Sequence, residues 1–158
     1  MRTTTLLGVA LLLAACAKKE DAKPAESAMA APAMAAPAPT PAPFSLSDAA
    51  GTWDYVARTP AGDTVLVQAV LTATADADHW TLLFKGRKPV PLRVTVSGDS
   101  VITAAGPYES VLRKGVMVTT DGFMHMTNGK LVGRSVAHYA TKSADSVRQL
   151  KVEGTRKP

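Results

Sequence analysis

Residues 51–74 read GTWDYVARTPAGDTVLVQAVLTAT, with apolar side chains at alternate positions on both sides of a central turn. The alternation runs from Trp53 to Ala57 and returns from Val65 to Ala73. A period of two is typical of a β-strand with one buried face, because successive side chains point to opposite faces. The stretch therefore predicts two strands joined through the turn residues PAGD at 60–63.

The same alternation continues to the C-terminus, interrupted by clusters of Gly, Asn, Asp and Pro that form turns. Asn128-Gly129 is the strongest hairpin signal, because a type I′ turn requires positive φ at both positions. Residues 107–115 are expected to form a further short strand or a bent connection. We predict strands near 52–59, 64–74, 79–85, 90–97, 100–105, 116–127, 130–140 and 146–155.

The short links between these strands favour antiparallel pairing of neighbours. About eight strands in a meander leave two edges exposed unless the sheet closes on itself. Closure at about eight strands produces an interior that side chains or one small ligand can fill. We therefore predict an all-β fold, a single antiparallel up-and-down barrel, with a β-sandwich as the alternative.

The chain before the strands has a different composition. Residues 17–43 contain 11 Ala and 6 Pro but no Val, Ile, Leu or aromatic residue. Such a segment buries too little apolar surface to offset the entropy lost on ordering. We expect a disordered linker at 16–43 and one β-barrel domain of 115 residues at 44–158.

The first residues are typical of an export signal, with a basic Arg2, an apolar run from Leu6 and small residues at its end. The run is too short to span a bilayer, which needs roughly 20 apolar residues. It ends in Leu13-Ala14-Ala15-Cys16, which resembles the lipobox of bacterial lipoprotein precursors. The resemblance implies a signal peptide at 1–15, cleavage between Ala15 and Cys16, and lipidation of Cys16 with acyl chains such as palmitate. An ordinary signal peptide with a chance Cys is the alternative.

The same resemblance implies a location. In lipoproteins an Asp directly after the lipidated Cys acts as a retention signal, and this chain has Ala17 there. A lipid anchor in the outer membrane, on its periplasmic side, is favoured, and the outer leaflet of the cytoplasmic membrane is the alternative. Cys16 is the only Cys in the chain, so a disulfide is excluded.

Gly51-Thr52-Trp53 follows a segment, 45–50, that suits a short helical turn. This start resembles the lipocalin and calycin group, in which a Gly-x-Trp motif opens the first strand of a barrel. The resemblance implies that Trp53 closes one barrel end beneath an arginine of the last strand region, either Arg148 or Arg156. The chain departs from the group because it has no pattern for a C-terminal helix and no disulfide.

The sequence contains no nucleophile elbow and no phosphate-binding glycine loop. The histidines are too widely spaced for a local metal motif, and the strand acids alternate with apolar neighbours as surface acids do. We therefore predict no enzymatic activity, no cofactor and no metal site. The titratable residues considered are His79, His125, His138, Asp54, Glu109 and Glu153.

Met124-His125-Met126 combines thioether and imidazole groups, which suit copper. On a strand, however, the two methionines point to one face and His125 to the other. We therefore expect Met124 and Met126 in the core and His125 outside it.

The chain has a formal net charge of +5, and residues 44–158 hold 14 basic against 10 acidic residues. This excess is modest and scattered, which argues against a nucleic-acid partner. The basic stretch at 85–93 flanks a turn and is interpreted as a solvated loop. We expect a monomer whose partners are the membrane, through its anchor, and either a small apolar ligand or an envelope protein.

Two functions remain open. In the first, the barrel binds a small hydrophobic or amphipathic molecule; in the second, it is filled and acts as a ligand-free structural or protein-interaction module of the cell envelope. The segment 107–115 would be a lid at the barrel mouth or a solvated edge. The residues predicted to line the cavity, or else to form the core, are Trp53, Tyr55, Trp80, Leu82, Phe84 and Tyr139.

Overall fold

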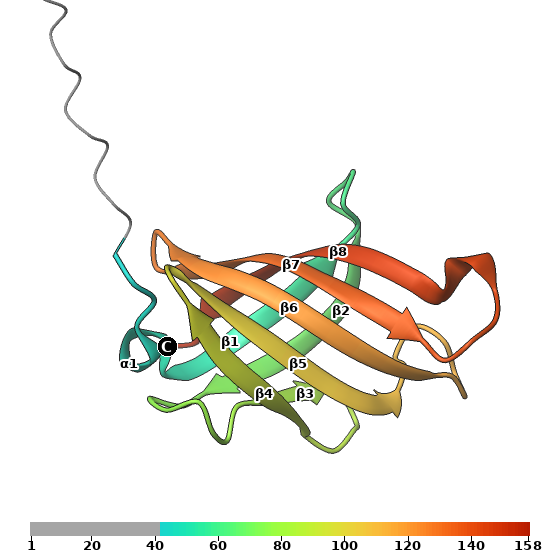
Figure 1. Cartoon of the computed structure of the whole chain (residues 1–158), viewed down its shortest axis with the longest axis horizontal. Helices are drawn as coiled ribbons and strands as arrows, with labels where there is room; N and C mark the ends of the chain where they lie inside the picture. Colours follow the sequence, from blue (N-terminus) through green and yellow to red (C-terminus); the bar gives the residue numbers. More distant parts are fainter. Residues whose placement is uncertain (1–41) are drawn as a thin grey trace, which may run out of the picture. The chain divides into compact units, whose positions relative to one another are not determined.

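The computed structural model describes residues 42–158, which form a short helix followed by eight strands (Figure 1). The elements are α1 (Leu46–Ala49), β1 (Gly51–Arg58), β2 (Val65–Ala73), β3 (Thr81–Phe84), β4 (Val90–Ser97), β5 (Ser100–Glu109), β6 (Met117–Thr127), β7 (Lys130–Tyr139), the 3₁₀ turn η1 (Ala144–Ser146) and β8 (Val147–Arg156).

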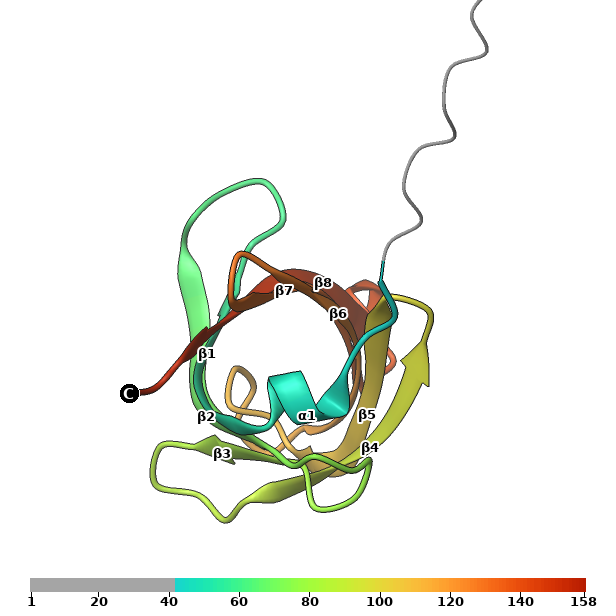
Figure 2. The ribbon, with the colours of Figure 1, turned by 90° about the vertical axis from the view of Figure 1, so that its left-hand side faces the viewer.

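The strands form one closed antiparallel barrel in which each strand pairs with its neighbours in sequence. The last strand, β8, pairs with β1 over six residue pairs, including Tyr55 opposite Gly154. Figure 2 looks along the barrel and shows the closed ring of strands. The predicted all-β up-and-down barrel is confirmed, and the alternative sandwich is not formed, because the β1–β8 ladder joins the two ends of the meander.

Two strands differ from the prediction by more than one residue at an end. The strand predicted at 79–85 is shorter, Thr81–Phe84, because His79 has a positive φ of 63° and turns the chain before the strand begins. The strand predicted to end at 105 continues to Glu109. The segment 107–115 is therefore divided between the end of β5 and the loop that follows it.

The meander places alternate loops at opposite ends of the barrel. The end that carries α1 and the C-terminus of the chain is called the base, and the opposite end is called the mouth (Figure 1). The base includes the loops 74–80, 98–99 and 128–129; the mouth includes the loops 59–64, 85–89, 110–116 and 140–146.

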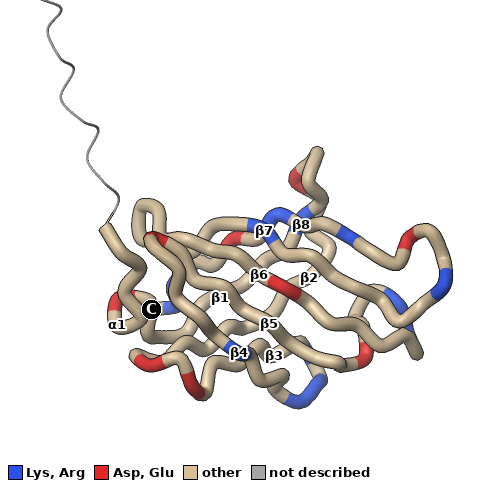
Figure 3. The backbone as a smooth tube through the Cα atoms, viewed as in Figure 1, with Lys and Arg blue, Asp and Glu red and all other residues tan. Residues whose placement is uncertain are grey.

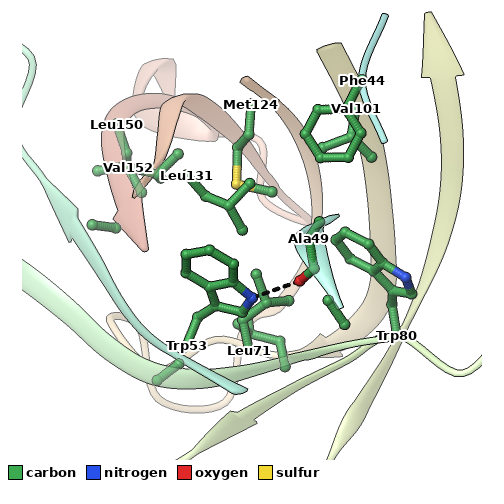
Figure 4. Packing of buried hydrophobic residues seen from close by; sticks show 14 of the residues in the cluster. Phe44, Ala49, Trp53, Leu71, Trp80, Val101, Met124, Leu131, Leu150 and Val152 are labelled. Atoms are coloured by element: carbon green, nitrogen blue, oxygen red, sulfur yellow. Dashed lines mark hydrogen bonds between the residues drawn. The ribbon is translucent and has the colours of Figure 1, made fainter. Parts of the chain in front are cut away.

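The base half of the barrel is filled. The hydroxyl of Ser45 caps α1 by accepting a hydrogen bond from the backbone N–H of Asp48 at 3.1 Å. The indole Nε1 of Trp53 donates to the carbonyl oxygen of Ala49 at 2.9 Å, which fixes the helix across the barrel end (Figure 4). The largest fully buried side chains of the core are Trp53, Trp80, Leu71, Leu131 and Val101.

Arg156, rather than Arg148, covers Trp53. Its guanidinium carbon lies 4.2 Å from the indole centroid, and its N–H groups donate to the carbonyl oxygens of Asp48 and Ala50. Gly51 has a φ of +138°, and a Cβ there would lie 2.6 Å from Nη1 of Arg156. The glycine therefore allows both the backbone conformation and the close approach of the arginine.

Candidate ligand-binding site

The six residues predicted to line a cavity or form the core fall into two groups. Trp53 and Trp80 lie in the core, and Nε1 of Trp80 donates to the carbonyl oxygens of Thr74 and Asp76 at 3.1 and 2.9 Å. These tryptophans close the base and contact no cavity at the mouth. The other four, Tyr55, Leu82, Phe84 and Tyr139, are among the residues that line a cavity in the mouth half. Leu82, Phe84 and Tyr139 are at the same time buried core residues.

This inner cavity has a volume of about 50 Å³. Part of its lining is polar, with the hydroxyl-bearing residues Tyr55, Tyr108, Ser110, Thr120, Ser135 and Tyr139. Ligand pockets for organic molecules typically measure about 300–1,000 Å³, whereas a partly polar cavity of the observed size has room for a few water molecules at most. The barrel interior therefore lacks room for a ligand of ordinary size.

Two tyrosines of the inner cavity have perturbed pKa values. Burial of its hydroxyl raises the pKa of Tyr55, the nearby Tyr108 raises it further, and the hydroxyl of Ser135 partly offsets both effects. Burial also raises the pKa of Tyr108, with a partial offset from the hydroxyl of Thr120. Both side chains are therefore neutral at pH 7 and offer a phenolic O–H as a donor.

The loop 110–116, called the lid, covers the mouth side of this cavity. The hydroxyl of Ser110 accepts hydrogen bonds from the backbone N–H groups of Leu112 at 3.0 Å and Arg113 at 3.1 Å. The guanidinium carbon of Arg113 lies 4.2 Å from the ring centroid of Tyr139. Since Leu112 also lines the cavity, the first residues of the lid cover it, whereas Lys114 and Gly115 are exposed.

A larger hollow lies in the barrel wall between the first residues of β4 and the last residues of β5. The β4–β5 ladder ends at the pair Leu92–Ala105, and beyond it the two strands leave a hollow of about 660 Å³, called the slot. Its volume falls within the range of ligand pockets. The apolar lining includes Phe84, Val90, Leu92 and Tyr108.

The bend of β5 at Gly106 contributes to this opening. Gly106 has a φ of +102°, and a Cβ there would lie 2.7 Å from the carbonyl oxygen of Val118. The β5–β6 register shifts between Ala105 and Tyr108, as in a β-bulge. A bulge bends its strand and ends regular pairing, so the last residues of β5 leave the line of β4.

Two prolines also favour the loss of backbone pairing between β4 and β5 at the slot. Pro91 on β4 and Pro107 on β5 both line the slot, and neither has an N–H group to donate to a ladder. Arg87, in the β3–β4 loop, reaches across and donates to the carbonyl oxygens of Glu109 and, from Nη2 at 3.2 Å, Ser110. A side chain therefore takes the place of ladder hydrogen bonds and holds the end of β5.

The rings of Phe84 and Tyr108 separate the slot from the inner cavity. Their centroids lie 5.5 Å apart with an angle of 28° between the planes, and both rings line both hollows. Such an offset pair is a stable apolar contact. The two rings are therefore the boundary between a large outer site and a small inner one.

The sequence prediction missed the slot, although it included Phe84. As expected for a solvated loop, Lys85, Arg87 and Lys88 lie in the exposed β3–β4 loop, whereas Arg93 lies on β4. The prediction did not foresee that Arg87, Lys88 and Arg93 also line a hollow. The prolines at 89, 91 and 107 were the available signal, because prolines within or beside strands mark places where pairing stops.

The metal and copper predictions concern other parts of the barrel. Within residues 42–158, no three His, Cys, Asp or Glu side chains lie close enough to hold a metal ion. Met124 is buried and Met126 packs against the core, while His125 alternates to the opposite face of β6. The three side chains therefore do not converge on one point.

The strand acids considered for catalysis have separate partners. Asp54 lies 3.2 Å from Nζ of Lys157, and Glu153 lies 2.9 Å from Nζ of Lys130. The hydrogen bond from Lys130 lowers the pKa of Glu153. Glu109 lies at the slot instead. Among the described residues these three carboxylates do not share a pocket.

No family model, curated protein or solved structure matches this chain. Among residues 42–158, no helix has the length and apolar character needed to cross a membrane. The predicted signal peptide at 1–15, lipidated Cys16 and almost all of the predicted linker at 16–43 lie outside the described residues.

Proposed function

We propose that this chain is a lipid-anchored envelope protein that binds a small amphipathic molecule in the slot between β4 and β5. The observation that carries the proposal is the slot itself, a hollow of about 660 Å³ with apolar side chains inside and cations along it. Small-molecule sites combine this kind of apolar lining with a few polar groups that orient the ligand.

The packing of the interior supports the slot rather than the barrel axis as the binding site. Trp53 and Trp80 are fully buried in the base half, and the remaining cavity measures about 50 Å³. Protein cores are packed as densely as organic crystals, so a larger ligand would have to displace core side chains. The slot accepts a ligand without that cost.

The anchor belongs to the same proposal. Leu13-Ala14-Ala15-Cys16 supports lipidation of Cys16, and Ala17 favours the outer membrane over the cytoplasmic membrane. Two or three acyl chains anchor far more firmly than one, because each buried CH₂ adds about 0.8 kcal/mol. No catalytic role is proposed for the barrel.

Blocking the slot tests the proposal. The chain from Ala17 to Pro158, called the lipid-free chain, lacks the predicted signal and Cys16 but keeps all the strands and the core. Its binding to N-phenyl-1-naphthylamine, an apolar probe that fluoresces in apolar surroundings, is measured by titration. Ala104→Trp places a large side chain in the slot and is expected to weaken binding at least about tenfold.

Ile102→Trp is the matched control. Ile102 lies two residues earlier on the same outward face of β5, is 41% exposed and does not line the slot. Its variant should bind the probe like the parent chain, and circular dichroism should show the same strand content for all three proteins. Equal binding by the two tryptophan variants, or no binding by the parent, would overturn the slot as the ligand site.

A ligand-free module of the envelope is the second candidate, favoured by the filled base and the small inner cavity. Native mass spectrometry of the chain purified from its own host separates the two functions. A retained small molecule that Ala104→Trp removes supports binding in the slot. A mass without any adduct, together with absent probe binding, supports the module.

A further inference from the structure

We infer that the molecule bound in the slot carries an anionic head group, held by Lys88 and Arg93, and one apolar tail that lies against Phe84 and Tyr108. This inference rests on the proposed function and specifies the chemical class of the ligand. It is supported by the charges at the slot, by the partners that those charges already have, and by the distribution of charge between the two barrel ends.

The slot has an excess of positive charge. Three of its lining residues are basic, Arg87, Lys88 and Arg93, and one is acidic, Glu109. Among the described residues, none of the three cations lies within 4.0 Å of a carboxylate oxygen. The carboxylate of Glu109 instead accepts a hydrogen bond from the backbone N–H of Gly115 at 3.0 Å.

The cations differ in their other contacts. Arg87 is used in the fold, because its guanidinium donates to two carbonyl oxygens at the end of β5. Lys88 follows it in the β3–β4 loop, and Arg93 is exposed on the outward face of β4, opposite Ala104. In Figure 3 the loop after β3 and a position on β4 are both basic. Lys88 and Arg93 are therefore the groups available to an anion.

The acid nearest to Arg93 along the sheet, Asp121, contacts a histidine instead of Arg93. Asp121 of β6 pairs with Ala104 and so lies two strands away from Arg93, roughly 10 Å at ordinary strand spacing. Its carboxylate lies 3.4 Å from Nε2 of His138 on β7, on the side away from β4. It therefore leaves the charge of Arg93 without a close counter-ion from the sheet.

The interior of the slot is apolar. Phe84 and Tyr108 lie between it and the inner cavity, and Val90 and Leu92 of β4 face inward and pack against the core. An apolar chain bound there is removed from contact with water, which is favourable. Its charged head group would contact Lys88 and Arg93, whose side chains remain partly hydrated. A single molecule with one tail and one anionic head satisfies both halves of the site.

The barrel ends have opposite charge. The mouth loops 59–64, 85–89, 110–116 and 140–146 contain six basic and two acidic residues. At the base, residues 42–50, the loops and residues 157–158 contain four acidic residues and one basic residue. Since the slot lies toward the mouth, the field of the whole barrel raises the local concentration of anionic molecules there.

The geometry favours a single amphiphile over a bilayer surface. The slot is a hollow between two strands, with two stacked rings at its inner side, and this shape receives one extended tail. A planar membrane would contact the outermost side chains without filling the hollow. The occupant that we infer is therefore a free single-tailed anionic amphiphile.

Three ligands with the same tail and different heads test the inference. Dodecanoate, dodecan-1-ol and dodecyltrimethylammonium, each below its micelle-forming concentration, compete with N-phenyl-1-naphthylamine for the lipid-free chain. Dodecanoate is expected to bind about tenfold or more tightly than the alcohol, and the cation is expected to bind most weakly. Raising the salt concentration should reduce only the advantage of dodecanoate.

Variants locate the head group. Arg93→Gln and Lys88→Gln should each weaken dodecanoate binding several-fold and leave dodecan-1-ol unchanged. Lys151→Gln is the control, because it removes the same charge from an exposed position on β8 outside the slot. Vesicles of anionic two-tailed lipid should not compete with N-phenyl-1-naphthylamine for the lipid-free chain. Competition by the vesicles as strong as that by dodecanoate would contradict a single-tailed ligand.

The outcomes separate the inference from the proposed function. If the three ligands bind equally and Ala104→Trp blocks them all, the slot is a ligand site and the anionic head is wrong. If dodecanoate is preferred but Lys151→Gln weakens it as much as Arg93→Gln does, the assignment to Lys88 and Arg93 is wrong. If no ligand binds, the proposed function fails and the inference fails with it.

Discussion

At the scale of single residues, Gly51, Trp53 and Arg156 explain how the base is closed. Trp53 is fully buried, bonds α1 through its indole N–H, and lies beneath the guanidinium of Arg156. The positive φ of Gly51 brings the strand start close to that guanidinium. These three residues thus hold α1, the indole of Trp53 and the guanidinium of Arg156 together at the base.

Arg156→Ala should lower the free energy of unfolding by about 1 kcal/mol, because it removes a cation–π contact and hydrogen bonds to two carbonyl oxygens at an exposed site. Urea denaturation followed by tryptophan fluorescence measures the change. Arg148→Ala, at an exposed position of β8, should stay within about 0.5 kcal/mol of the parent. Equal losses in both variants would contradict the assigned role of Arg156.

Because Tyr55 has a raised pKa, we predict that the free energy of unfolding falls at alkaline pH. Burial raises its pKa in the folded state above the value near 10 of an unfolded chain. The unfolded state therefore releases its proton first as the pH rises through about 10, and the free energy of unfolding falls from there up to the folded pKa. Below pH 10 the tyrosine contributes no pH dependence.

Tyr55→Phe should reduce this alkaline loss, measured as the difference in unfolding free energy between pH 8 and pH 11. Tyr108→Phe should act in the same direction, since burial raises its pKa as well. If the unfolding free energy of Tyr55→Phe depends on pH as that of the parent does, folding does not raise the pKa of Tyr55.

At the scale of elements, the departures from a regular meander produce the site. Alternation of apolar residues predicted the long strands β6 and β7 to within one residue at each end. It missed the extension of β5, because the pattern breaks at Gly106-Pro107 and a break is read as the end of a strand. The bulge there depends on how closely β6 approaches Gly106, which only the folded sheet defines.

Arg87→Gln should loosen the end of β5 and the lid. The substitution removes the guanidinium that holds the carbonyl oxygens of Glu109 and Ser110, so amides in residues 109–116 should exchange hydrogen about tenfold faster or more. Hydrogen–deuterium exchange with mass spectrometry measures this. Lys88→Gln, next in the same loop, should leave the exchange of 109–116 unchanged. Unchanged exchange in Arg87→Gln would mean that Arg87 does not hold the slot.

At the scale of the whole molecule, the barrel has a filled base, a covered mouth and a side opening. The base carries α1 and excess acid, the mouth carries the lid and excess basic residues, and the slot lies toward the mouth in the wall. A closed barrel has no exposed sheet edge at which another chain would add. The unpaired stretch at the slot is the exception, and the prolines and Arg87 occupy it.

The anchor is a prediction about the whole chain. Cys16→Ser should abolish incorporation of labelled palmitate and release the protein from the membrane fraction of its host. Ala17→Asp is the informative partner variant: it should retain the label but move the protein from outer to cytoplasmic membrane on a sucrose gradient. Palmitate labelling that persists in Cys16→Ser would contradict the lipobox interpretation.

The sequence by itself determined the fold class, because a period of two and turn residues are local properties of the chain. The resemblance of Gly51-Thr52-Trp53 to the lipocalin and calycin group implied in addition that Trp53 lies beneath an arginine of the last strand region. Only the tertiary structure decided that this arginine is Arg156 and that basic residues at 85–93 border a slot. It also decided that Trp53 and Trp80 serve in the core alone, while Tyr55 and Phe84 in addition line a hollow. These facts depend on the positions at which the pairing of neighbouring strands ends. Contacts between residues far apart in the chain set those positions.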